Sequence, residues 1–191
     1  MPHQPEHSPE ALSIGRITPR EPAAALELES EAIGIDGAIE ARYSALEQNL
    51  SPPLRWTPLD EAGAWAVIVE DPDAPREHPF VHWMIWNIAG DAEGLAEGVA
   101  NTSHPITPQG AVQGMNDNGS PGWFGPEPPP GTGLHRYYFQ LFALDGPLTL
   151  HAAADLRALV DTLKGRVVAQ TELIGTFAAP PAPGDIDARA P

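Results

Sequence analysis

The chain has 191 residues, a length typical of one domain, and its 42% share of hydrophobic residues excludes wholesale disorder. Its 23 prolines and 18 glycines exclude a mostly helical protein, because both residues interrupt helices. The formal net charge of −16 argues against binding to nucleic acid or to anionic membranes, and the lack of cysteine excludes disulfides, thiol nucleophiles and cysteine-ligated metal.

The two ends of the chain differ in composition from the middle. Residues 1–25 are rich in proline and acidic side chains and predict a flexible N-terminal arm. Residues 178–191 are rich in proline and alanine and predict a disordered tail. No stretch has the roughly 18 apolar residues of a membrane span, and the start lacks the pattern of a signal peptide. We therefore expect a cytoplasmic protein with one domain over residues 26–177.

Four segments carry the pattern of β-strands. Alternating apolar and polar residues over 26–30 predict a half-buried strand, and the glycines of 33–37 predict a tight turn after it. Runs of β-branched and aromatic residues over 64–70, 81–88 and 136–144 predict three core strands. About 45 residues rich in Gly, Pro, Asn and Ser separate the last two strands. A loop of that length indicates a functional role.

The C-terminal part predicts at least one helix. Apolar residues recur at helical spacing over 155–163. The segment after Gly165 fits either a second helix or a final strand. Several strands followed by one or two helices predict a mainly β domain with a helical C-terminal part.

Aromatic residues are concentrated in the predicted strands and the long loop. They form more aromatic surface than one small cavity requires, and aromatic residues are enriched at protein interfaces. We therefore expect a homodimer with an apolar interface, with burial of the same residues in the core as the alternative. The residues concerned are Trp65, Trp83, Trp86, Trp123 and Phe124.

The first segment with candidate chemistry is Asp71-Pro72-Asp73-Ala74-Pro75, which follows the strand 64–70. Each proline fixes its own φ and restricts the residue before it, so Asp71 and Asp73 are held in a stiff geometry. The structural alternative is an Asx turn that closes the strand.

Two histidines lie near the starts of later strands. Strict alternation along 81–88 places His82 on the same face as Met84. If that strand pairs with 64–70, His82 lies near the aspartates. His135 and Tyr137 alternate onto one face of the last strand, directly after the proline-rich segment GPEPPPG.

These residues fit three kinds of site. His82, His135 and one aspartate match a metal-binding triad, as in a metal-dependent hydrolase. A nucleophilic hydrolase fits poorly, because the sequence has no G-x-S-x-G elbow and Ser120 has the surroundings of a turn. The third kind is a pocket for a small anion or zwitterion, in which the imidazoles and Tyr137 donate hydrogen bonds to phosphate. The residues alone leave the metal site and the anion site open.

The order of three motifs resembles the phosphatidylethanolamine-binding protein family, which includes Raf kinase inhibitor protein. These are DPDAP at 71–75, the pair His82-Trp83, and GPEPPPGTGLHRY at 125–137. Further similarity lies at 49–56, with SPPLRW, and over the last predicted strand at 172–177, which resembles the bacterial YbhB/YbcL-type, Raf kinase inhibitor-like branch. The resemblance covers about residues 26–177.

The resemblance implies a Greek-key β-sandwich of two antiparallel sheets with peripheral and C-terminal helices, and no cofactor or metal. It implies non-catalytic binding of a small phosphorylated or zwitterionic ligand of the phospholipid head-group type. Inhibition of a partner kinase or other enzyme through the pocket rim is the alternative. Many bacterial relatives have cysteine where this chain has Glu127, whose carboxylate repels phosphate unless it points outward. The positions that match the ligand-binding motif are Asp71, Asp73, Pro75, His82, Gly125, Pro128, Pro129, His135 and Tyr137.

Overall fold

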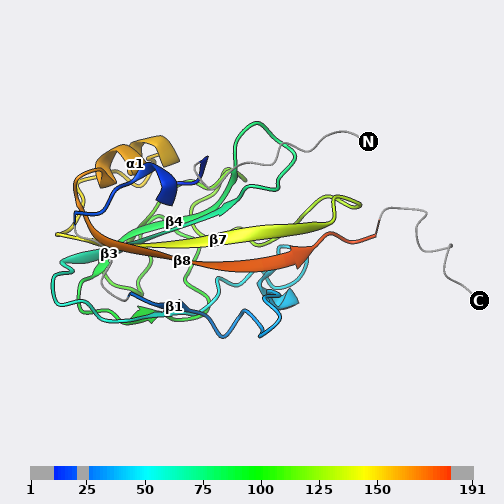
Figure 1. The fold of residues 1–191 in the computed structure, drawn as a ribbon, viewed down its shortest axis with the longest axis horizontal. Coiled ribbons are helices and arrows are strands. Elements are labelled where there is room, and N and C mark those ends of the chain that lie inside the picture. The colour runs from blue at the N-terminus through cyan, green and yellow to red at the C-terminus, as the bar shows by residue number, and fades with distance from the viewer. Residues whose placement is uncertain (1–10, 21–25, 182–191) are drawn as a thin grey trace, which may run out of the picture.

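The computed structural model describes residues 11–20 and 26–181 (Figure 1). The helical elements are the 3-10 turns η2 (Ile14–Arg16) and η3 (Ala41–Tyr43) and the α-helix α1 (Leu156–Leu163). The strands are β1 (Leu28–Glu29), β2 (Leu54–Trp56), β3 (Ala64–Asp71), β4 (Phe80–Ala89), β5 (Gly94–Leu95), β6 (Val112–Gln113), β7 (Leu134–Leu144) and β8 (Val167–Ala178). As expected, they form two antiparallel sheets, one of three strands in the order β1-β2-β5 and one of five in the order β6-β4-β3-β7-β8.

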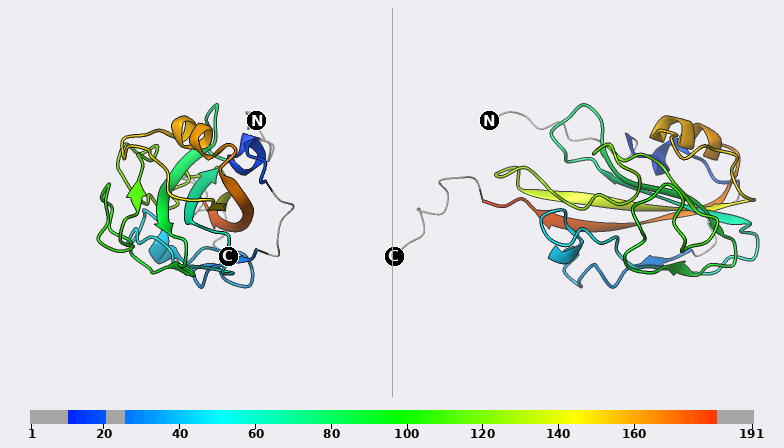
Figure 2. Two further views of the ribbon diagram at one scale, coloured as in Figure 1. Left: turned by 90° about the vertical axis from the view of Figure 1, so that its left-hand side faces the viewer. Right: turned by 180° about the vertical axis from the view of Figure 1, so that it is seen from behind.

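Both faces of the five-stranded sheet are covered, which explains the uninterrupted apolar run of β3. All eight residues of that strand are buried. Trp65 and Val67 pack toward the three-stranded sheet, whereas Ala66 and Ile68 pack toward α1. Figure 2 shows the resulting layers, with α1 and residues 11–20 on one side of the large sheet and β1 on the other.

Residues 11–20 are packed against the sheet, so the prediction of a loosely attached arm is wrong for this part. Leu12 is fully buried, and the Ser13 backbone nitrogen donates to the Glu70 carboxylate at 2.9 Å. The Ile14 nitrogen donates to Gln140 Oε1 at 2.6 Å. The proline-rich composition predicted a flexible arm, whereas Leu12, Ser13 and Ile14 are enough to anchor the segment. The rest of the predicted arm, residues 1–10 and 21–25, and residues 182–191 of the predicted tail lie outside the described residues.

The C-terminal part contains one α-helix among the described residues, and of the two alternatives left open for the segment after Gly165 the structure has the final strand. Helix α1 follows Asp155, whose side chain accepts a hydrogen bond from the Ala158 nitrogen at 2.8 Å. The segment after Gly165 forms β8, which pairs with β7 along its whole length. Its β-branched valines and threonines favour a strand over a helix. No helix in the described ranges is long and apolar enough to cross a membrane.

The tryptophans expected at a dimer interface fill the core instead. Each of Trp65, Trp83, Trp86 and Trp123 is at most 1% exposed. Three of the indole nitrogens also donate hydrogen bonds inside the domain, such as Trp83 Nε1 to Gln113 Oε1 at 2.7 Å. The aromatic interface is therefore wrong for these four side chains, and the homodimer itself stays a prediction.

Candidate functional site

The candidate site lies where β3 ends and where its two antiparallel neighbours, β4 and β7, begin. The pairing sets Asp71 opposite Phe80 of β4, and Glu70 opposite Tyr138 of β7. Antiparallel pairing therefore brings the DPDAP turn close to the starts of both strands that carry histidine. The side chains of Asp71, His82 and His135 line one cavity of about 270 Å³. The predicted residues in its lining are Asp71, Pro75, His82, Pro128, Pro129, His135 and Tyr137.

His82 reaches this cavity because β4 contains an irregularity that simple alternation does not predict. The pairing of β4 with β3 slips by one residue between Val81 and Trp83, and His82 is the extra residue. A bulge of this kind turns one side chain to the other face. The predicted placement with Met84 is therefore wrong, since Met84 packs toward α1. The imidazole of His82 instead lies 5.0 Å from the Tyr137 ring, between centroids.

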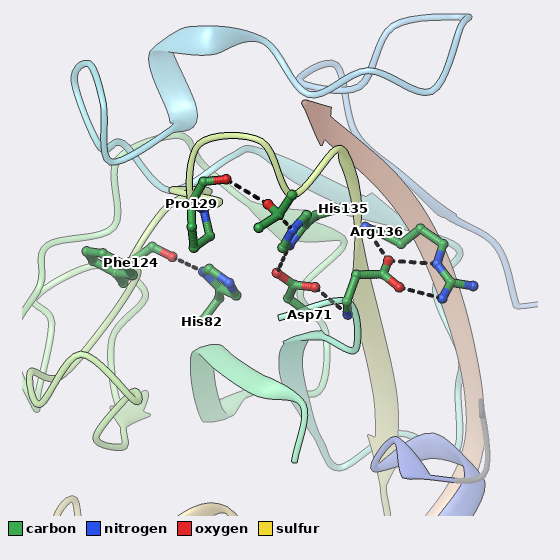
Figure 3. Close-up of polar contacts among 8 residues, drawn as sticks. Asp71, His82, Phe124, Pro129, His135 and Arg136 are labelled. Carbon is green, nitrogen blue, oxygen red and sulfur yellow. Dashed lines mark hydrogen bonds and ion pairs between the residues drawn. The ribbon is translucent and has the colours of Figure 1, made fainter. Parts of the chain in front are cut away.

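Asp71 combines the two predicted roles of the DPDAP segment. Its Oδ1 accepts a hydrogen bond from the Asp73 nitrogen at 2.7 Å, which is the Asx turn. Its Oδ2 lies 2.8 Å from His135 Nδ1, and the two side chains point toward each other in Figure 3. Both residues are at most 3% exposed. The Asx turn thus fixes the Asp71 carboxylate, and this carboxylate orients the His135 imidazole.

The second nitrogen of His135 is also occupied. The Thr132 hydroxyl donates to the Pro129 carbonyl oxygen at 2.7 Å, so it accepts from His135 Nε2 at 2.8 Å. Each ring nitrogen therefore has a partner inside the protein, Asp71 at Nδ1 and Thr132 at Nε2. Through Thr132, His135 connects the proline-rich segment at Pro129 to the sheet, and it has no N–H left to donate to another molecule.

Asp73 lies outside the cavity lining, contrary to the prediction. Its carboxylate accepts from the backbone nitrogen, Nε and Nη2 of Arg136 at 2.9, 2.8 and 2.7 Å (Figure 3). Burial alone would raise the pKa of Asp73, but the hydrogen bonds and charge of Arg136 outweigh it and hold the pKa below its usual range. Asp73 therefore connects the DPDAP turn to β7 through Arg136, and its carboxylate does not line the cavity.

Gly125 does not line the cavity either. A Cβ at this position would overlap the carbonyl oxygen of Tyr43, and the Gly125 nitrogen donates to Asn49 Oδ1 at 2.8 Å. The glycine allows two loops to approach each other closely. Its role is to place the proline-rich segment, not to contact a ligand.

Among the buried side chains of the lining, His82 and Tyr137 each keep one polar atom for which no partner in the protein is described. Burial lowers the pKa of His82 to about 4, although the Phe124 carbonyl and the Asp71 charge oppose the shift. The neutral ring donates from Nδ1 to that carbonyl at 2.6 Å, which leaves Nε2 as an acceptor. The Tyr137 hydroxyl is buried without a hydrogen-bond partner, and burial with the nearby aspartates raises its pKa, so it stays a donor. The expectation that both imidazoles donate is therefore wrong.

Five residues of the cavity lining were not among the predicted site residues; Ala74 and Glu127 lie inside the motifs, and the other three lie beside them. Arg76 follows the DPDAP motif directly, Phe80 pairs with Asp71, and Phe124 precedes the proline-rich segment, so nearness to the motifs was the available signal. The Arg76 guanidinium lies 5.2 Å from the centre of the Phe80 ring. Arg76 and Glu127 bring both signs of charge to the lining, and half of its other residues are proline or phenylalanine.

The arrangement does not fit the metal triad that the sequence left open. Both nitrogens of His135 and Nδ1 of His82 have partners within the protein. Across residues 11–20 and 26–181, no group of three or more histidine, aspartate or glutamate side chains has the geometry to hold a metal ion.

Comparisons with known proteins agree with the fold and the motif order. Residues 29–178 match the sequence model of a family described as phosphatidylethanolamine-binding protein. A UPF0098 protein of Methanothermobacter thermautotrophicus is 40% identical over 153 residues, which cover 80% of this chain and 98% of the relative. The candidate lipoprotein LppC of Mycobacterium tuberculosis is 32% identical over 173 residues, which cover 91% of this chain and 82% of the relative.

A solved structure shows the same architecture. The crystal structure of Escherichia coli YbcL, described as a member of the mammalian family, superposes with a TM-score of 0.74 and 27% identity. The match covers 81% of this chain and 98% of YbcL. Sequence, motif order and fold thus agree, and the chain belongs to the phosphatidylethanolamine-binding protein family.

Proposed function

We propose that the chain binds a small ligand with a phosphorylated or zwitterionic head group in this cavity and catalyses no reaction on it. The observation that carries the proposal is the Tyr137 hydroxyl, a buried donor without a partner. Buried polar groups in folded proteins almost always have a partner, and an exception calls for an explanation. An acceptor oxygen of a ligand would satisfy Tyr137, and a donor on the same ligand would satisfy His82 Nε2.

The size and walls of the cavity favour a head group over a whole lipid. Ligand pockets for drug-sized molecules measure about 300–1,000 Å³, and this cavity measures about 270 Å³. The charges in the lining, Arg76 and Glu127, match the two ends of a zwitterion. A simple anion meets Arg76 but is repelled by Glu127, which favours a ligand that also carries an ammonium group.

Non-catalytic binding is supported by the chemistry of the lining. The described cavity-lining residues include no serine, threonine, cysteine or lysine that would act as a nucleophile. Family membership supports a ligand-binding or regulatory role at the family level. A binding protein is therefore the simplest interpretation of a cavity with a buried donor at Tyr137, a buried acceptor at His82 and rigid proline walls.

Calorimetric titration tests this proposal. Phosphoethanolamine should bind the wild-type protein at one site, and Tyr137→Phe should weaken binding about tenfold, the equivalent of one hydrogen bond. Tyr138→Phe is the matched control, because Tyr138 is the next residue of β7 and its hydroxyl accepts from Arg136 on the opposite face. Equal affinity in the wild type and Tyr137→Phe, or no binding of phosphoethanolamine to the wild type, would contradict the proposal.

The assembly and compartment are separate proposals. We propose a homodimer in the cytoplasm, supported by the resemblance to bacterial relatives; its interface has to overcome the repulsion between two chains that each carry a net charge of −16. Sedimentation at low and high salt tests the homodimer. A monomer at micromolar protein concentration under both salt conditions would contradict it. Fractionation of cells that produce the full-length protein tests the second, and its recovery in the membrane fraction would place it with the lipoprotein relative.

A further inference from the structure

Arg76 has a position that links the cavity to a neighbouring loop. It lines the cavity, and it also borders a second cavity of about 440 Å³ that lies against α1. Its Nη1 donates to Asp117 Oδ2 at 3.0 Å, while its guanidinium packs over Phe80. We propose that Arg76 is the specificity-determining residue for the anionic part of the ligand, and that Asp117 is its positioning residue. This inference rests on the proposed function of the same cavity.

The remaining lining leaves few groups for an anion. Asp71 and Glu127 are carboxylates, His82 is a neutral acceptor, and both nitrogens of His135 are occupied. The prolines of the wall have no backbone N–H to donate. Among the described lining residues, a donor with permanent positive charge is therefore supplied by Arg76, with the neutral Tyr137 hydroxyl as a second donor.

Asp117 is anchored strongly enough to orient Arg76. Its Oδ2 accepts from the Val81 nitrogen at 3.0 Å, and its own nitrogen donates to the Val81 carbonyl oxygen at 2.9 Å. One bond through the carboxylate and one through the backbone hold Asp117 to Val81, a buried residue of β4 in the large sheet. The ion pair then fixes the guanidinium, and the Phe80 ring supports its face. Held in this position, the guanidinium places a permanent positive charge at the edge of the cavity, in a planar group that lysine does not have.

The expected effect is moderate, because the Arg76 side chain is 44% exposed and solvent screens its charge. Arg76→Gln should raise the dissociation constant for phosphoethanolamine about tenfold, and Arg76→Lys should recover only part of the loss. Asp117→Asn should raise it several-fold, since asparagine keeps an oxygen for the Val81 nitrogen but loses the charge that holds Arg76. Once Arg76 is removed, Asp117→Asn should add nothing.

The experiment is a calorimetric double-mutant cycle on the full chain with phosphoethanolamine, repeated at two NaCl concentrations. The salt dependence should be smaller in Arg76→Gln, a change that a purely structural role would not cause. Arg157→Gln is the control, because this 90% exposed arginine borders only the second cavity and changes the net charge equally. Wild-type binding with an unchanged constant in Arg76→Gln would overturn the inference and leave the proposed function intact. Additive losses in the double variant would overturn the role of Asp117, whereas no binding to the wild type would overturn both proposals.

Discussion

The buried imidazole of His82 should make the stability of the protein depend on pH. The residue is 3% exposed, and its pKa falls from 6.5 to about 4 in the folded state. The unfolded chain therefore binds the proton more readily than the folded protein. The free energy of unfolding should fall as the pH drops below about 6.5 and should stop falling from this cause near pH 4.

The size of the effect follows from the two pKa values. At about 1.4 kcal/mol per pH unit, the full loss is about 3 kcal/mol, a large part of the stability of an ordinary domain. Carboxylates also titrate in this range, so the measured quantity is the difference between the wild type and His82→Asn. The asparagine amide can replace Nδ1 as the donor to the Phe124 carbonyl, and it does not titrate.

Chemical denaturation at pH 7.0 and pH 4.5 measures this difference. Between pH 7.0 and pH 4.5, the free energy of unfolding of the wild type should fall by roughly 2–3 kcal/mol more than that of His82→Asn. His78→Asn, which removes an exposed histidine, should behave as the wild type does. Parallel losses in the wild type and His82→Asn, or an NMR titration of the His82 ring with a midpoint near 6.5, would refute the reasoning.

Three further predictions concern single side chains. Tyr137→Phe should change the free energy of unfolding by less than about 0.5 kcal/mol in denaturation experiments, because the removed hydroxyl has no partner in the protein; a large loss would reveal an internal role. Glu127→Gln should strengthen binding of inorganic phosphate several-fold in calorimetry, because it removes a repulsive charge from the lining; unchanged affinity would mean that Glu127 points outward. Arg136→Gln should lower the free energy of unfolding by about 1–2 kcal/mol, because Asp73 loses two charged hydrogen bonds; equal stability would show that the turn does not need this pair.

Local sequence patterns predicted the elements that build the site. The apolar runs predicted β3, β4 and β7, and antiparallel pairing of neighbours explains why a turn after one strand meets the starts of the next two. Motif order then placed Asp71 beside His135. These features depend on residues close in sequence or on the register of regular strands, which alternation predicts.

The errors arose where a distant partner decides the outcome. His82 faces the cavity because the pairing of β4 with β3 shifts by one residue at this position. The alternation of residues within β4 alone does not predict this bulge. Asp73 turns outward because Arg136, 63 positions later, binds its carboxylate. Leu12 is buried because its segment covers the part of the large sheet near Glu70, which lies far from it in the sequence. Each of these depends on packing between separate elements.

The most direct test of the binding claim is an NMR titration of the full-length protein, labelled on histidine and tyrosine, with phosphoethanolamine. The free protein should show His82 as the neutral tautomer with its proton on Nδ1. Saturating ligand should shift the His82 Nε2 and Tyr137 ring signals together, with one dissociation constant, while the exposed His104 stays unchanged. If the His82 and Tyr137 signals stay fixed at millimolar phosphoethanolamine, or if only exposed residues respond, the cavity does not bind this head group and the account is contradicted.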